Sequence, residues 1–294
     1  MIALQRPLNE MKGIDLMRNS RKLLGSALAA ASLFALVAPA SAITGGEPDG
    51  EGHPGVAMIV FYEPAGRFRC TATLVTPTVL ITAAHCTEGT IGQTFVTFAT
   101  NVPAVPAAAV PANGYEVMNY NGTTVTGTAY THPNYSGFTD FDNWNDVGVI
   151  VLDAAVNDRP LASLAPLNYL DAFGQPVLNK TLFTLVGFGT EVRKPESGPQ
   201  KPVPMSFPRI RRVAESPGQK LTPQIVQMNG NINDTRGTGG TCFGDSGGPS
   251  YLNGYIVTVT SYGYTSNCRY IGGHQRIDIP VVQDWLALFG VVPG

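Results

Sequence analysis

The sequence predicts an all-β protein that ends in one short helix. From Ile43 onward, short runs rich in β-branched and aromatic residues are separated by Gly, Pro and Asn, a pattern typical of strands joined by tight turns. The exception is 280–289, where apolar residues recur at helical spacing behind a proline suited to a helix start. The clearest predicted strands are 56–61, 71–80, 95–98, 147–152, 181–186, 255–262 and 275–279.

The composition fits a folded protein with a large core. The chain has 294 residues, of which 44% are hydrophobic and 14% charged, which argues against disorder. The formal net charge is −2, and because residues 1–42 carry five basic and two acidic side chains, the remainder is more acidic. This balance does not suggest a nucleic-acid partner.

Residues 1–42 have the features of a signal peptide. A basic stretch at 18–22 precedes an apolar stretch at 23–37, and an Ala-x-Ala cleavage site ends at Ala42. Translation starts at Met1 or at Met17. A transmembrane anchor is the alternative, but about 15 apolar residues fall short of the roughly 20 that span a bilayer. We therefore expect a secreted protein that has no membrane association after cleavage.

The strongest functional signal is the motif GDSGGP at 244–249. A serine flanked by glycines can stand on a tight turn, where a substrate carbonyl can approach and backbone N–H groups can stabilise an oxyanion. Because a serine hydroxyl is a weak nucleophile alone, Ser246 needs a base and a group that orients the base. His85, within the motif TAAHC, and Asp146 are the candidates for these roles.

Asp146 has two neighbouring rivals, Asp140 and Asp142. Asp146 immediately precedes an apolar strand, where a carboxylate must be buried and hydrogen-bonded, whereas the other two lie in a polar loop. Asp146 is therefore the preferred partner of the histidine.

With these motifs in the order His, Asp, Ser, the chain from Ile43 to its end resembles the trypsin/chymotrypsin family of serine proteases. The resemblance implies a protease domain at 43–294, built of two six-stranded antiparallel β-barrels over about 43–160 and 161–294, with the active site between them. It implies a monomeric serine endopeptidase that acts through an acyl-enzyme, without cofactor or metal. Polypeptide substrates and protein protease inhibitors are the partners that it implies.

The resemblance also implies roles for residues beside the nucleophile. The backbone N–H groups of Gly244 and Ser246 would form the oxyanion hole. Cleavage after Ala42 would free the α-ammonium of Ile43, which would pair with Asp245, because a buried carboxylate without a partner costs several kcal/mol. Signal cleavage itself would then produce the active form.

Substrate preference is predicted from the residue at the floor of the family's specificity pocket. That position is Gly240, where an aspartate would select Lys or Arg. The resemblance adds four further substrate-binding residues, and the open, uncharged slot predicts a preference for large apolar or aromatic side chains rather than Lys or Arg. These four residues are Ser261, Tyr262, Gly263 and Gly272.

The four cysteines permit three disulfide pairings. Proximity in the sequence and the family resemblance both favour Cys70 with Cys86 and Cys242 with Cys268, each contributing about 3 kcal/mol by loop entropy. Zinc binding is the alternative, but the spacings contain no Cys-x-x-Cys pair and no close histidine pair.

Two other functions compete with a protease. The segment 244–248 also fits the Gly-x-Ser-x-Gly motif of α/β-hydrolases, but their order of Ser, acid and His fails because no acidic residue lies between Ser246 and His274. A catalytically inactive homologue that acts as a binding or adhesion module is the second alternative. All three candidate catalytic residues are present, which favours the enzyme.

Overall fold

A computed structural model describes residues 43–102, 124–192 and 205–294 of the chain. The predicted signal peptide therefore lies outside the described residues. Within them, strands dominate, and one α-helix, α1 (Pro280–Ala287), follows the last strand. No helix in these ranges is long and apolar enough to cross a membrane.

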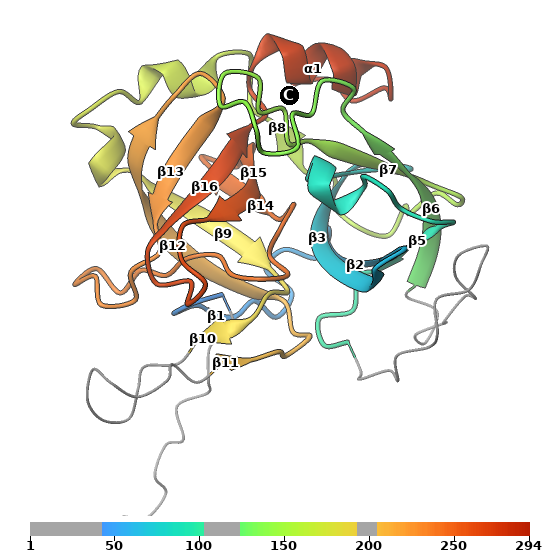
Figure 1. Ribbon diagram of the computed structural model, residues 1–294, viewed down its shortest axis with the longest axis horizontal. Helices are drawn as coiled ribbons and strands as arrows, with labels where there is room; N and C mark the ends of the chain where they lie inside the picture. The colour runs from blue at the N-terminus through green and yellow to red at the C-terminus, as the bar shows by residue number, and fades with distance from the viewer. Residues whose placement is uncertain (1–42, 103–123, 193–204) are drawn as a thin grey trace, which may run out of the picture. The chain divides into compact units, whose positions relative to one another are not determined.

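Six antiparallel strands form a first closed barrel, in the order β2-β3-β4-β7-β6-β5 (Figure 1). A single turn of 3₁₀ helix, Ala84–Cys86, follows β4. The strands are β2 (Val56–Glu63), β3 (Gly66–Thr76), β4 (Val79–Thr82), β5 (Thr94–Thr97), β6 (Thr124–Thr131) and β7 (Gly148–Leu152).

A second set of six strands also closes, because β9 pairs with both β14 and β12 at the ends of the order β12-β13-β16-β15-β14. These strands are β9 (Leu182–Gly187), β12 (Arg212–Leu221), β13 (Ile225–Asn229), β14 (Pro249–Leu252), β15 (Tyr255–Gly263) and β16 (Ile271–Arg276). The short remaining elements are β1 (Glu47–Pro48), β8 (Ser163–Leu164), β10 (Glu191–Val192), β11 (Met205–Ser206) and the 3₁₀ turns Tyr169–Ala172 and Leu178–Lys180.

The predicted fold class, two six-stranded antiparallel barrels with a short terminal helix, is confirmed. The prediction of one strand over 71–80 is wrong: β3 and β4 are antiparallel neighbours separated by a turn at 77–78. Pro77 has no N–H to donate to a sheet, which suits a turn. The last strand begins at Ile271 and ends at Arg276, earlier than predicted, because its glycines conceal it in the sequence.

An apolar cluster joins the two barrels to the terminal helix. It combines Ile81 and Val149 of the first barrel with Ile256 and Val259 of the second, and α1 adds Leu286. All five side chains are almost completely buried. Removing this surface from water favours one docked arrangement of the barrels, so the junction between them is part of the core.

Leu286 and Leu288 provide a test of this packing. Leu286 is fully buried, whereas Leu288 is 78% exposed. We expect Leu286→Ala to lower the free energy of unfolding by about 2–5 kcal/mol, because it leaves a cavity in the cluster. Leu288→Ala should change it by less than about 0.5 kcal/mol. Urea unfolding of both variants measures the difference, and equal effects would contradict the packing role of α1.

Candidate active site

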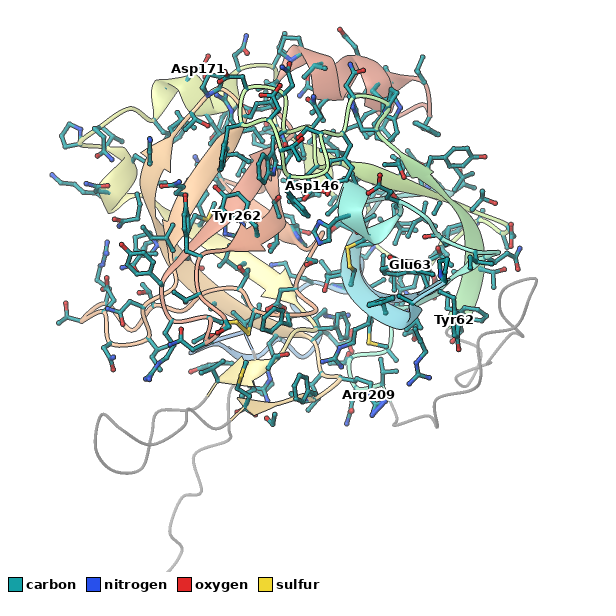
Figure 2. All side chains as sticks on the ribbon, viewed as in Figure 1. Tyr62, Glu63, Asp146, Asp171, Arg209 and Tyr262 are labelled. Atoms are coloured by element: carbon teal, nitrogen blue, oxygen red, sulfur yellow. A yellow bond between two sulfur atoms is a disulfide. The ribbon has the colours of Figure 1, made fainter. Side chains whose placement is uncertain are left out.

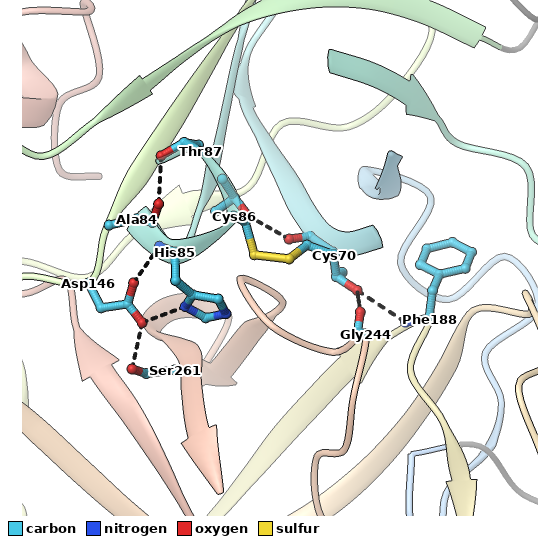
Figure 3. The surroundings of a disulfide bond; sticks show 11 residues. Cys70, Ala84, His85, Cys86, Thr87, Asp146, Phe188, Gly244 and Ser261 are labelled. Atoms are coloured by element: carbon cyan, nitrogen blue, oxygen red, sulfur yellow. Dashed lines mark hydrogen bonds and ion pairs between the residues drawn. A yellow bond between two sulfur atoms is a disulfide. The ribbon is translucent and has the colours of Figure 1, made fainter. Parts of the chain in front are cut away.

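His85 and Asp146 are positioned by two neighbouring strands of the first barrel. His85 lies in the 3₁₀ turn after β4, and Asp146 lies two residues before β7, whose Gly148 pairs with Thr82. The Asp146 Oδ1 atom accepts a hydrogen bond from the backbone N–H of His85 at 2.9 Å, and Oδ2 lies 2.9 Å from the ring Nδ1 (Figure 3). The carboxylate therefore fixes both the backbone and the ring of the histidine.

The second barrel completes the surroundings of Asp146, which is fully buried. Ser261 of β15 donates its hydroxyl to Asp146 Oδ2 at 2.6 Å, and the backbone N–H of Asp146 donates to Gln275 Oε1 of β16 at 3.0 Å. Trp144 Nε1 donates to the Ser261 oxygen at 2.8 Å. Figure 2 shows Asp146 where the two barrels meet. The carboxylate is thus held from both sides of the junction.

The electrostatics favour the charged form of His85. Burial alone disfavours an imidazolium, but the Asp146 carboxylate, helped by Glu63, outweighs burial and raises the pKa of His85 above its ordinary value. The hydrogen bond at Nδ1 leaves Nε2 as the ring nitrogen available for other partners. His85 is therefore suited to accept a proton at Nε2.

The loop that carries Ser246 is attached to the first barrel by hydrogen bonds to Thr71 of β3. The Thr71 N–H donates to the Ser246 carbonyl at 2.8 Å, and the Thr71 hydroxyl donates to the Gly244 carbonyl at 2.9 Å. A Cβ at Gly247, which has a φ of +74°, would lie 2.0 Å from Thr82 Oγ1. Glycine is required there by both space and backbone conformation.

Ser246 and His85 line the same cavity. Ser246 is half-buried, and among the described residues its hydroxyl forms no hydrogen bond to the imidazole. Hydrogen bonds of this kind are often long without substrate and shorten when substrate binds. Gly244 has a φ of +97°, a conformation that favours glycine beside the serine.

Asp245 is a second fully buried carboxylate. Its oxygens accept hydrogen bonds from the N–H groups of Gly189 at 2.7 Å and Cys242 at 2.9 Å. Burial outweighs these bonds and the charge of Arg69, and raises the pKa of Asp245 to about 7. A Cβ on Gly187 or Gly189 would lie 2.2 Å from a carboxylate oxygen, so both glycines make room for this side chain.

Ile43 begins the described chain and is fully buried. Its φ is +48°, which is unfavourable for a β-branched residue. The next residue, Thr44, accepts a hydrogen bond from the Gly240 N–H at 2.9 Å, on the segment that leads to Asp245. The N-terminal segment is therefore bound to the loop that carries the second buried carboxylate.

The shared cavity has a volume of about 430 Å³. Of the predicted substrate-binding residues, Ser261, Tyr262, Gly263 and Gly272 line it. Gly240 is not among the described lining residues, and a Cβ there would lie 2.3 Å from the Gly230 Cα. Gly240 thus lies close to the backbone of Gly230, next to the lining residue Thr241 in the sequence.

A family model described as Trypsin matches residues 43–286. The chain belongs to the trypsin family of serine proteases. Members of this family are hydrolases that act on polypeptides.

Individual relatives agree with this assignment. A trypsin from Saccharopolyspora erythraea is 31% identical over 230 residues, covering 75% of this chain and 86% of that protein. Brachyurin from Leptuca pugilator is 28% identical over 206 residues, covering 68% and 78%. A solved structure named HL collagenase is 17% identical with a TM-score of 0.58, covering 86% of this chain and 100% of that one, which shows a shared fold. The α/β-hydrolase alternative does not fit this architecture.

Sequence reasoning missed several residues of this trypsin-family site. Gln275 accepts a hydrogen bond from the backbone of Asp146, and Trp144 donates one to Ser261. The Phe138 ring lies 5.4 Å from the His85 ring, and both residues line the cavity. Trp144 is two residues before Asp146, which was the one available signal. Nothing in the local pattern marks the other two.

The structure contains the disulfides Cys70–Cys86 and Cys242–Cys268. The first joins β3 to the turn of His85, and the second joins the segment before Ser246 to the segment before β16. The three side chains Cys70, His85 and Cys86 lie close enough to hold a metal ion, but both cysteines are already used in the disulfide. The zinc alternative therefore has no thiolates at this place.

The space that Gly189 gives Asp245 can be tested against a matched glycine. Gly189→Ala would place a methyl group 2.2 Å from Asp245 Oδ2, whereas a Cβ on Gly174 meets nothing within 4 Å. We expect Gly189→Ala to lower the free energy of unfolding by at least about 1 kcal/mol and Gly174→Ala to have little effect. Urea unfolding measures both. Equal stabilities would mean that Asp245 is not confined by this glycine.

Proposed function

We propose that residues 43–294 form a secreted serine endopeptidase in which Ser246 is the nucleophile, His85 the general base and Asp146 the group that orients the base. The observation that carries this proposal is that His85, whose ring is paired with the buried Asp146 carboxylate, lines the same cavity as Ser246. The motif order and the membership of the trypsin family support it.

In the first half of the reaction, the Ser246 hydroxyl attacks the peptide carbonyl carbon, and His85 Nε2 takes the proton. The carbonyl electrons move to oxygen, where the N–H groups of Gly244 and Ser246 stabilise the oxyanion, and loss of one such donor costs about 10²–10³ in rate. The tetrahedral intermediate then expels the amine, which takes the proton from His85. An ester of Ser246 remains.

In the second half, water replaces the amine. His85 removes a proton from water as it attacks the ester carbonyl, and then returns that proton to Ser246 as the acid leaves. Asp146 remains ionised beside the imidazolium that forms in each half.

The substrates are polypeptides, and protein inhibitors of proteases are further expected partners of the monomer. Large apolar or aromatic side chains are preferred before the cleaved bond, and Lys or Arg are not. The exclusion of Lys and Arg is supported by the absence of a carboxylate among the described lining residues, because a buried cation would have no partner.

A covalent probe and a peptide library test the proposal together. A fluorophosphonate should label the protein that begins at Ile43 once per molecule, at Ser246, and the library should reveal cleavage after non-cationic residues. Ser246→Ala should abolish both signals while the protein remains folded. Absence of labelling in the folded wild-type protein would favour the inactive binding module.

We further propose that cleavage after Ala42 activates the enzyme through a pair between the Ile43 α-ammonium and Asp245. The buried carboxylate has no ion-pair partner within the described residues, and its raised pKa reflects that lack. Cleavage also removes the peptide bond that defines the unfavourable φ of Ile43. Both effects favour the inserted terminus.

Stability against pH tests this activation. When the amine is blocked by one extra residue, the folded-state pKa of Asp245 of about 7 exceeds the unfolded value near 3.8. The folded form then binds more protons, so the free energy of unfolding should fall by about 3 kcal/mol as the pH rises from 4 to 7, relative to the protein that begins at Ile43. Urea unfolding of the two Ser246→Ala proteins measures this difference. Parallel pH profiles, or full activity of the extended wild-type enzyme, would contradict the pair.

A further inference from the structure

The proposed mechanism leaves one buried histidine of the second barrel unused. His274 lies in β16, is 1% exposed and has no acidic partner among the described residues. Burial lowers the pKa of His274 to about 3, so its ring is neutral under ordinary conditions. A neutral imidazole has one donor and one acceptor nitrogen.

The neighbours of the ring decide which nitrogen carries the hydrogen. Nδ1 lies 3.3 Å from the Ser250 hydroxyl and 3.5 Å from the Thr260 hydroxyl, and within the described residues neither hydroxyl has another hydrogen-bond partner. A protonated Nδ1 would leave both hydroxyl hydrogens without an acceptor, whereas the lone pair of an unprotonated Nδ1 accepts one of them, a difference of about 1–3 kcal/mol. Nδ1 is therefore the acceptor, and Nε2 carries the hydrogen.

The Nε2–H donor lies just behind two residues of the cavity wall, although His274 itself is not among the described lining residues. A Cβ on Gly272 would lie 3.2 Å from His274 Nε2 and 3.2 Å from Thr241 Oγ1. Gly272 and Thr241 both line the cavity that contains Ser246. The missing side chain at Gly272 thus leaves two polar groups beside open space. Nε2 has no acceptor among the described residues.

The charge of the cavity limits which ligand group can use these donors. No Lys, Arg, Asp or Glu belongs to the lining formed by the described residues. A carboxylate or an ammonium group placed there would be desolvated without a counter-ion, whereas an uncharged acceptor would gain hydrogen bonds at smaller cost.

We propose that His274 and Thr241 form a polar end to the substrate pocket that favours, before the cleaved bond, side chains whose tip carries an uncharged hydrogen-bond acceptor. The enzyme then prefers Gln to Leu and Tyr to Phe at this position. The inference rests on the proposed protease function. It keeps the exclusion of Lys and Arg, and it replaces the preference for apolar side chains by a preference for large uncharged side chains with a polar tip.

Matched peptides that differ only in this residue test the inference. We expect kcat/KM of the wild-type enzyme to be at least about tenfold higher for Gln than for Leu and higher for Tyr than for Phe, because a polar site left unpaired rejects the apolar analogue. His274→Phe keeps the ring shape and removes the N–H donor. It should bring both ratios close to one by lowering kcat/KM for Gln and Tyr.

Two further variants keep the test decisive. His132→Phe is the matched control, because His132 is also buried but contacts Val281 and Trp285 rather than the space beside Gly272, and it should leave both ratios unchanged. Thr241→Val removes the second donor without changing side-chain volume much, and should lower the ratios even if His274→Phe fails to fold.

The outcomes separate the two proposals. Three results would each overturn the inference and leave the protease function intact. They are cleavage with no preference for Gln or Tyr, ratios that do not change in the His274 and Thr241 variants, and faster cleavage after Glu than after Gln. Absence of cleavage after any residue, by a protein that is correctly processed and folded, would overturn both.

Discussion

A buried carboxylate at the junction of two barrels, Asp146, is the constraint on which the site depends. Burying a charge costs several kcal/mol unless it is hydrogen-bonded, and the donors come from both barrels: the His85 backbone and ring on one side and the Ser261 hydroxyl on the other. Separating the barrels would expose this group and break its bond with Ser261, leaving only the bonds from His85. The docking that builds the apolar junction therefore also aligns the imidazole.

At Asp245, in contrast, the cost of burial exceeds the stabilisation of the carboxylate by its neighbours. Asp245 is equally buried, but it has two backbone N–H donors and only a more distant arginine as a positive charge. The raised pKa of this carboxylate reflects the incomplete compensation of its charge in the intact chain. Under our proposal, Asp146 is hydrogen-bonded before and after cleavage, whereas Asp245 gains a positively charged partner only when cleavage frees the Ile43 amine.

The sequence indicates candidate residues for the site but not the contacts among them. His85 and Ser246 lie in short sequence motifs, TAAHC and GDSGGP, so they could be selected as candidates without a structure. The bond between Ser261 and Asp146 joins residues 115 positions apart, and the bond from Asp146 to Gln275 spans 129. No local pattern encodes such pairs, because they arise when two separately closed barrels dock.

Two strand predictions, 71–80 and 275–279, differ from the structure for a related reason. Apolar residues on both sides of Pro77 gave one continuous run, whereas the chain turns there and pairs with itself. Glycines in β16 concealed a strand that places His274 next to the cavity. In both cases the deciding contacts lie across the sheet, where neither periodicity nor composition reports them.

The titration of His85 tests the central claim most directly. NMR of the Ser246→Ala protein beginning at Ile43, with the resonance assigned by a His85→Ala variant, gives the pKa of the ring. Our account predicts a pKa above the ordinary value of about 6.5, and a clear decrease when Asp146→Asn removes the carboxylate charge. A pKa at or below the ordinary value, or one that Asp146→Asn leaves unchanged, would contradict the account.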